Sequence, residues 1–157
     1  MFQTNFSLSY LPTNLDKFRY IEKCSQYCYN IPVKGGKYMK DSPLINKSKA
    51  FALEVLKVCK ELRATKCEGV LINQFIRSGT SIGANIREAF YAHSKADFVS
   101  KLQIALKECY ETEYWIELLI DGGYYNNKEI QEECIEIKKI LISSINTAKE
   151  NMKQIHL

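Results

Sequence analysis

From about residue 46 onward, apolar side chains recur three and four positions apart, the spacing that places them on one side of an α-helix. This pattern predicts four helices: about Asn46 to Thr65, Glu68 to Ala92, Ser94 to Asp121, and from Asn126 or Asn127 toward the C-terminus. Because the connections are short, we expect an all-α fold, an up-down-up-down antiparallel four-helix bundle. The predicted core stripes, helix by helix, are Phe51, Val55, Val58, Leu62; Leu71, Phe75, Ile82, Ile86, Ala89; Phe98, Leu102, Ala105, Cys109, Thr112, Ile116, Leu119; and Ile130, Cys134, Ile137, Leu141, Ser144, Ala148.

Two of the predicted helices also carry apolar side chains away from these stripes. In a monomer such residues would face water, so they predict a contact with another subunit. We take them as candidates for an oligomer interface: Leu53, Leu56, Tyr110, Tyr114 and Leu118.

The second predicted helix contains two glycines four positions apart, Gly79 and Gly83. Each costs about 1 kcal/mol relative to alanine inside a helix, so a compensating role is expected. We interpret them as a helix-packing motif that lets a neighbouring helix approach closely. A phosphate-binding backbone is the weaker interpretation, because the spacing of a phosphate-binding loop is absent and no predicted strand precedes the segment.

Residues 1–43 differ from the helical part, residues 44–157. They hold all three prolines and no sustained periodicity, which predicts an irregular or disordered N-terminal extension. Codons for Lys34-Gly35-Gly36 can spell a purine-rich ribosome-binding sequence two codons upstream of Met39. One hypothesis is therefore that Met39 is the true start. The alternative is that these residues simply form a turn.

The composition excludes several classes of protein. No run of 18 apolar residues occurs, which argues against a membrane-spanning helix, and the N-terminus does not read as a secretory signal; we therefore expect a cytoplasmic protein. The six cysteines form no Cys-x-x-Cys pair, and only two histidines are present. We expect no metal, no cofactor and no small-molecule substrate, and reduced, buried thiols.

Charge is distributed unevenly along the chain. Residues 40–107 carry 12 Lys and Arg against 6 Asp and Glu, whereas residues 108–136 carry 9 acidic residues against Lys128 alone. These regions could pair across subunits in a head-to-tail ring, or they could be ordinary solvated faces. The candidate phosphate contacts lack interleaved exposed aromatic residues and are Lys49, Lys57, Lys60, Arg77, Arg87 and Lys101.

Three segments closely resemble the four-helix bundle proteins encoded by intervening sequences in bacterial 23S ribosomal RNA genes. The segments are Lys47-Ser48-Lys49-Ala50-Phe51-Ala52, Arg77-Ser78-Gly79-Thr80-Ser81-Ile82-Gly83-Ala84-Asn85-Ile86-Arg87-Glu88-Ala89, and Ser94-Lys95-Ala96-Asp97-Phe98 with the later Glu113-Tyr114-Trp115-Ile116-Glu117-Leu118-Leu119. The accessory protein of diversity-generating retroelements is a more distant likeness. The resemblance implies a bundle that assembles into ring-shaped pentamers, and a partner that is RNA or a reverse transcriptase. It implies no activity.

From these observations we expect a non-catalytic homo-oligomer that acts as an RNA- or protein-binding accessory. One enzymatic alternative exists: Arg87 and His93 have the spacing of a metal-independent HEPN-type ribonuclease, in which His93 would transfer protons and Arg87 would hold the phosphate. A purely structural assembly is the other alternative.

Overall fold

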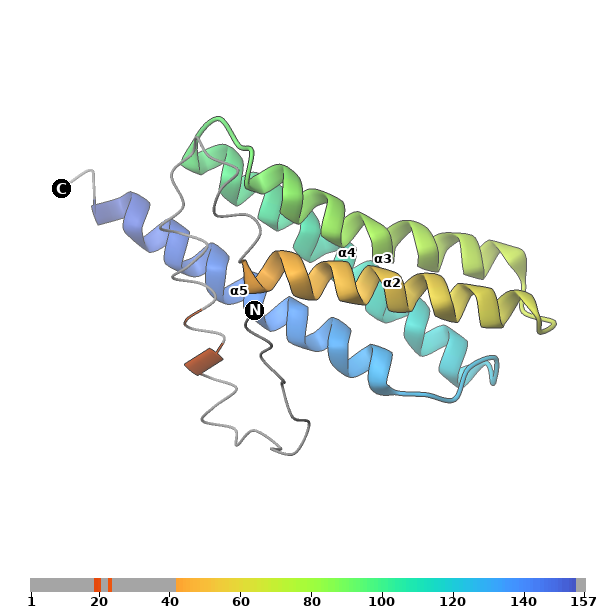
Figure 1. The fold of residues 1–157 in the computed structure, drawn as a ribbon. Coiled ribbons are helices and arrows are strands. Elements are labelled where there is room, and N and C mark those ends of the chain that lie inside the picture. The colour runs from red at the N-terminus through yellow and green to blue at the C-terminus, as the bar shows by residue number, and fades with distance from the viewer. Residues whose placement is uncertain (1–18, 21–22, 24–41, 155–157) are drawn as a thin grey trace, which may run out of the picture.

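The computed structural model describes residues 19–20, 23 and 42–154, and four long helices make up most of residues 42–154 (Figure 1). In the numbering of Figure 1 they are α2 (Pro43–Arg63), α3 (Gly69–Ala89), α4 (Lys95–Asp121) and α5 (Glu129–Gln154). The described residues contain no strand. The predicted all-α four-helix bundle is confirmed.

Each helix packs against the helices that precede and follow it, and α2 also contacts α5, so the four surround one core. The α3–α4 contact is the most extensive and the α2–α5 contact the smallest. Figure 1 shows the chain reversing its direction at each of the three connections. The two ends of the bundle therefore differ: one carries the α3–α4 turn, and the other carries the α2–α3 and α4–α5 connections.

The first bundle helix begins earlier than the periodicity predicts. Ser42 is its N-cap, and the Ser42 hydroxyl accepts a hydrogen bond from the backbone N–H of Ile45 at 3.5 Å. Pro43 occupies the first turn, where its missing N–H costs nothing and its fixed φ favours the helix. The predicted start near Asn46 is therefore wrong by about one turn, because Pro43 initiates the helix.

Local interactions define both ends of the α4 helix. The Ser94 hydroxyl accepts a hydrogen bond from the Asp97 N–H at 3.1 Å, as a capping box requires. The Asp97 carboxylate, however, accepts from the N–H of His93 at 3.1 Å. At the other end Gly123 adopts a φ of 73°, which only glycine tolerates readily, and the chain leaves the helix there.

The core contains nearly all of the predicted stripes. Phe51, Phe75 and Ile137 are among its fully buried side chains, and Thr112 and Ser144 are buried with them. The prediction is off by one residue at two positions. Leu71 and Phe98 are only half-buried, whereas their neighbours Ile72 and Val99 are buried. Both changes fall in the first turns of helices, where the angle to the core depends on how neighbouring helices pack. Met39 and nearly all of the predicted N-terminal extension lie outside the described residues.

Candidate nucleic-acid interface

The geometry of the candidate interface begins with the contact between α2 and α3. A Cβ atom added at Gly79 would lie 2.8 Å from a methyl carbon of Val55, and one added at Gly83 would lie 3.5 Å from the carbonyl oxygen of Ser48. The two glycines therefore sit where the helices approach most closely. Beyond this line of contact, both helices turn a side toward solvent, and we call that side the α2–α3 face.

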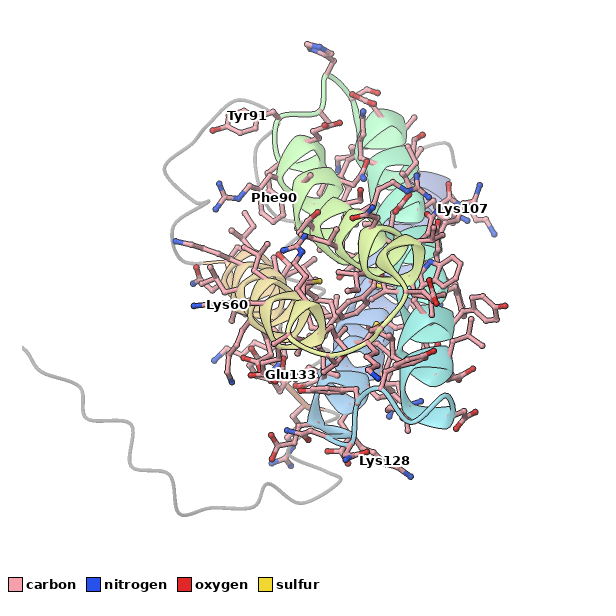
Figure 2. The ribbon with its side chains drawn as sticks, turned by 90° about the vertical axis from the view of Figure 1, so that its right-hand side faces the viewer. Lys60, Phe90, Tyr91, Lys107, Lys128 and Glu133 are labelled. Atoms are coloured by element: carbon pink, nitrogen blue, oxygen red, sulfur yellow. The ribbon has the colours of Figure 1, made fainter. Side chains whose placement is uncertain are left out.

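Three of the predicted cations lie on the α2–α3 face. Lys49 follows Ser48 on α2, and Arg87 lies one turn beyond Gly83 on α3, so the two flank the same point of helix contact. Lys60 lies three turns further along α2 and points outward (Figure 2). All three side chains are exposed, and none forms an ion pair with any residue that the structure describes.

The other three candidate cations are already paired with carboxylates. Lys57 Nζ lies 3.0 Å from a Glu54 oxygen on the same helix. Arg77 and Lys101 instead bridge α3 to α4, with Arg77 2.7 Å from a Glu111 oxygen and Lys101 2.6 Å from a Glu88 oxygen. These hydrogen bonds to Glu54 and Glu88 raise the pKa of Lys57 and of Lys101 respectively. The six candidates thus separate into three paired cations and three cations without an ion pair.

Arg77 belongs to a polar cluster that joins α3 to α4. Its Nε donates to the side chain of Gln74 at 3.2 Å, while Glu111 also accepts a hydrogen bond from the indole N–H of Trp115 at 3.3 Å. One carboxylate therefore receives donors from both helices. Sequence reasoning missed this role of Trp115. Its i,i+4 spacing from Glu111 was the available signal.

Glu108 lies beside this cluster with one carboxylate oxygen, Oε2, buried and without a hydrogen-bond partner. Burial raises the pKa of Glu108, and the negative charge of Glu111 adds to the effect, while Arg77 opposes it. A buried carboxylate without a donor disfavours its charged form. The folded protein therefore disfavours the ionised form of Glu108.

The candidate oligomer-interface residues fall on two sides of the bundle. On α2, Leu53 is 57% exposed and Leu56 46%, and on α4, Tyr110 is 51% and Tyr114 52% exposed. Leu118, in contrast, is half-buried. On the Tyr110 side, Lys138 of α5 lies 5.1 Å from the centre of the Tyr110 ring and pairs with Glu113. The sequence analysis missed further exposed apolar side chains, of which Val70 and Tyr91 are the most exposed.

The pair named in the ribonuclease alternative lies at the end of the bundle that carries the α3–α4 turn. Arg87 is in the last turn of α3, and His93 is exposed in the turn that follows. The His93 backbone N–H donates to Asp97, and no described hydrogen bond joins the two side chains. The structure provides neither residue with a described partner that would orient it for proton transfer.

The described cysteines form no disulfide, and three of them are buried: Cys59, Cys109 and Cys134. Burial raises the pKa of Cys59 to about 11. The Cys134 thiol donates to the carbonyl oxygen of Cys109 at 3.5 Å, across the α4–α5 contact. These side chains behave as small core residues. Within the described ranges there is no cluster of three metal-ligating side chains, and no helix is long and apolar enough to cross a membrane.

The sequence matches the family of 23S rRNA-intervening sequence proteins over residues 40–143. That segment includes α2, α3, α4 and more than half of α5. The chain belongs to this family. The resemblance inferred from the three sequence segments is thereby confirmed, and the matched segment holds every candidate residue discussed above.

A solved structure supports the same assignment. It is a protein of unknown function from the S23 ribosomal protein family of Bacteroides thetaiotaomicron VPI-5482, and it is 50% identical in sequence. The alignment covers 65% of this chain and 97% of that chain, with a TM-score of 0.63. No curated protein matches the sequence. Membership of the family therefore establishes the fold and leaves the biochemical role to be argued from the surface.

Proposed function

We propose that this member of the 23S rRNA-intervening sequence family is a non-catalytic RNA-binding accessory that associates with copies of itself. The observation that carries the proposal is the separation of the candidate cations. Lys49, Lys60 and Arg87 share the α2–α3 face and form no ion pair with the described residues, whereas the paired cations belong to other contacts. Cations without a carboxylate partner are available for phosphates.

Electrostatic attraction supplies most of the proposed affinity. Each phosphate that a lysine or arginine neutralises releases a counterion, so binding weakens as the salt concentration rises. Three contacts are few, and we therefore expect weak binding by one subunit. Several subunits held together would present their faces to one RNA, and the combined affinity would exceed that of each.

A gel-shift experiment with RNA across a series of salt concentrations tests this proposal. We expect a shift at low salt that disappears as salt rises, and that weakens when Lys49 and Arg87 are both changed to glutamate. Lys49→Glu and Arg87→Glu are also measured singly, and their matched control is Lys107→Glu, because it makes the same charge change at an exposed position on the opposite side of the bundle (Figure 2). No shift by the unmodified protein at low salt would reject RNA binding.

Self-association is supported by the two exposed apolar pairs and the charges around them. Leu53 and Leu56 lie among lysines on α2, while Tyr110 and Tyr114 lie on the acidic half of α4. A contact between two different patches is head to tail, and it forms a closed ring when the rotation between successive copies closes. Five is the copy number that the family resemblance implies. Lys49 precedes Leu53 by one helical turn and Lys60 follows Leu56 by one turn, so such a contact would border both lysines and leave Arg87 of α3 outside it.

Sedimentation velocity tests the self-association. The double variant Leu53→Glu/Leu56→Glu places two negative charges against the acidic α4 patch of the next copy, so we expect it to dissociate to monomers. Val70→Glu is the control, because Val70 is 69% exposed on α3 and lies outside both patches. A clean monomer for the unmodified protein would remove this part of the proposal.

The proposal assigns no catalysis to Arg87 and His93. Under it, His93→Ala leaves RNA binding and RNA integrity unchanged. Cleavage of RNA by the unmodified protein that His93→Ala abolishes would favour the ribonuclease alternative instead.

A further inference from the structure

Tyr91 is the most exposed aromatic side chain that the structure describes, with 62% of its surface accessible. It directly follows Phe90, the C-cap of α3, and its backbone N–H donates to the carbonyl oxygen of Glu88 at 3.0 Å. The backbone at Tyr91 is thus tied to the end of the helix. The neighbouring Phe90 is buried and packs edge-on against Phe98, with ring centres 6.2 Å apart. The turn is therefore anchored, while the Tyr91 ring is left outside the core.

The residues near Tyr91 indicate what its exposed ring could bind. Arg87 precedes it by four residues, and Lys49 follows Ser48, which contacts Gly83 one turn before Arg87. Figure 2 shows Tyr91 pointing to the same side of the bundle as Lys60, away from Lys107. We call Lys49, Arg87 and Tyr91 the basic corner. It combines one aromatic ring that lies outside the core with two cations that form no ion pair with the part of the chain that the structure describes.

Carboxylates near the basic corner are occupied elsewhere. Glu88 follows Arg87 in sequence, but its carboxylate pairs with Lys101 on the α4 side at 2.6 Å. Asp97 accepts the backbone N–H of His93. Lys101 therefore neutralises Glu88, whereas Asp97 keeps its charge, and neither carboxylate forms an ion pair with Arg87 or Lys49.

Cations beside an exposed aromatic ring are typical of proteins that bind single-stranded nucleic acid. Proteins that bind single strands contact the backbone with cations and stack bases on aromatic rings, and each stacked base contributes about 1–3 kcal/mol. In a duplex the bases are already stacked on one another, and the protein meets mainly phosphates and 2′-hydroxyls. An exposed ring beside two cations therefore favours a single strand over a duplex.

We propose that the basic corner binds single-stranded RNA, with Tyr91 stacked on an unpaired base and with Lys49 and Arg87 on the adjacent phosphates. This inference rests on the proposed RNA binding and specifies which form of RNA is bound. It assigns a role to Tyr91, which the charge pattern alone did not indicate.

Fluorescence anisotropy with a labelled single-stranded RNA and its matched duplex tests the inference in the full-length protein. Tyr91→Ala should weaken binding to the single strand about 5- to 150-fold, the range that corresponds to one stacked base. Tyr91→Phe keeps the ring and should bind like the unmodified protein. The duplex should bind more weakly and should respond little to Tyr91→Ala. Because Tyr91 is exposed, none of these changes should alter folding, which circular dichroism can verify.

Different failures have different meanings. If the unmodified protein binds neither RNA at low salt, the proposed function itself is wrong. If it binds RNA, and Lys49→Glu/Arg87→Glu weakens that binding while Tyr91→Ala does not, RNA binding stands and the stacking role is overturned. Binding of the duplex as tight as that of the single strand also overturns it. A change in sedimentation caused by Tyr91→Ala would show instead that the corner contacts a second copy.

Discussion

The two glycines of α3 face different neighbours, and alanine should therefore have opposite effects at the two positions. At Gly83 the new methyl group would lie 3.5 Å from the carbonyl oxygen of Ser48, which is an ordinary contact. At Gly79 it would lie 2.8 Å and 3.0 Å from the two methyl carbons of Val55, closer than carbon atoms pack. Val55 is buried and β-branched, so it cannot rotate its methyl groups away without leaving its preferred rotamer.

The expected magnitudes follow from two competing effects. Replacing glycine by alanine inside a helix stabilises it by about 1 kcal/mol at either position. Nothing opposes this gain at Gly83, so Gly83→Ala should raise the free energy of unfolding by up to about 1 kcal/mol. At Gly79 the overpacking costs about 1–3 kcal/mol, so Gly79→Ala should be neutral or destabilise by up to about 2 kcal/mol. The two variants should differ by about 1–3 kcal/mol.

Urea unfolding followed by far-ultraviolet circular dichroism measures this difference. All variants should be compared at one protein concentration, because self-association adds to the apparent stability. Adding Val55→Ala to Gly79→Ala removes the clash, so the double variant should be more stable than the sum of the two single effects predicts. If Gly79→Ala stabilises as much as Gly83→Ala, or if the double variant is additive, the close α2–α3 approach is not as described.

Three further predictions concern caps, buried charge and thiols. Ser94→Ala removes the α4 N-cap hydrogen bond and should lower the free energy of unfolding by about 1 kcal/mol in the same assay. Because burial raises the pKa of Glu108 above its unfolded value, its contribution to stability is present at low pH and is lost as pH rises through the folded-state pKa. Glu108→Gln should therefore stabilise the protein at neutral pH and reduce the fall in stability between acidic and neutral pH; an unchanged profile would contradict the burial of its carboxylate. Among the thiols whose surroundings are described, Cys67 is only partly buried and should be alkylated before Cys59, as peptide mapping by mass spectrometry can check.

Much of the fold follows from local pattern because each helix has one apolar stripe and short connections. The start of α2 does not follow from local pattern, because proline ends a helix at most positions and is favourable only in the first turn. Whether Pro43 terminates or initiates depends on Ser42, whose hydroxyl caps the helix. The prediction also placed Leu71 and Phe98 in the core, where the structure instead buries their neighbours Ile72 and Val99. A periodicity fixes which residues share a side, but neighbouring helices decide which side is innermost.

The candidate site was predicted less completely, because charge pairing between helices depends on their register. Arg77 and Glu111 are 34 residues apart, and Lys101 and Glu88 are 13 apart. Nothing local marks either pair, so the sequence presents Arg77 and Lys101 as equals of Arg87. Tyr91 was missed for a related reason. It stands among apolar neighbours, and only the direction in which α3 ends shows that Phe90 enters the core and Tyr91 does not.

The small α2–α5 contact has a consequence for how the bundle opens and folds. It is the only contact between described helices that are not consecutive, whereas the extensive α3–α4 contact joins segments separated by a few residues and is held by two cross-helix ion pairs. Contacts between nearby segments cost little loop entropy and form early, and weakly packed elements open first. We therefore expect amide hydrogen exchange to protect α3 and α4 as one cooperative unit, with α2 and α5 exchanging sooner. The two helices that carry the proposed RNA contacts would then differ in stability. The free energy of local unfolding would be higher for α3 than for α2.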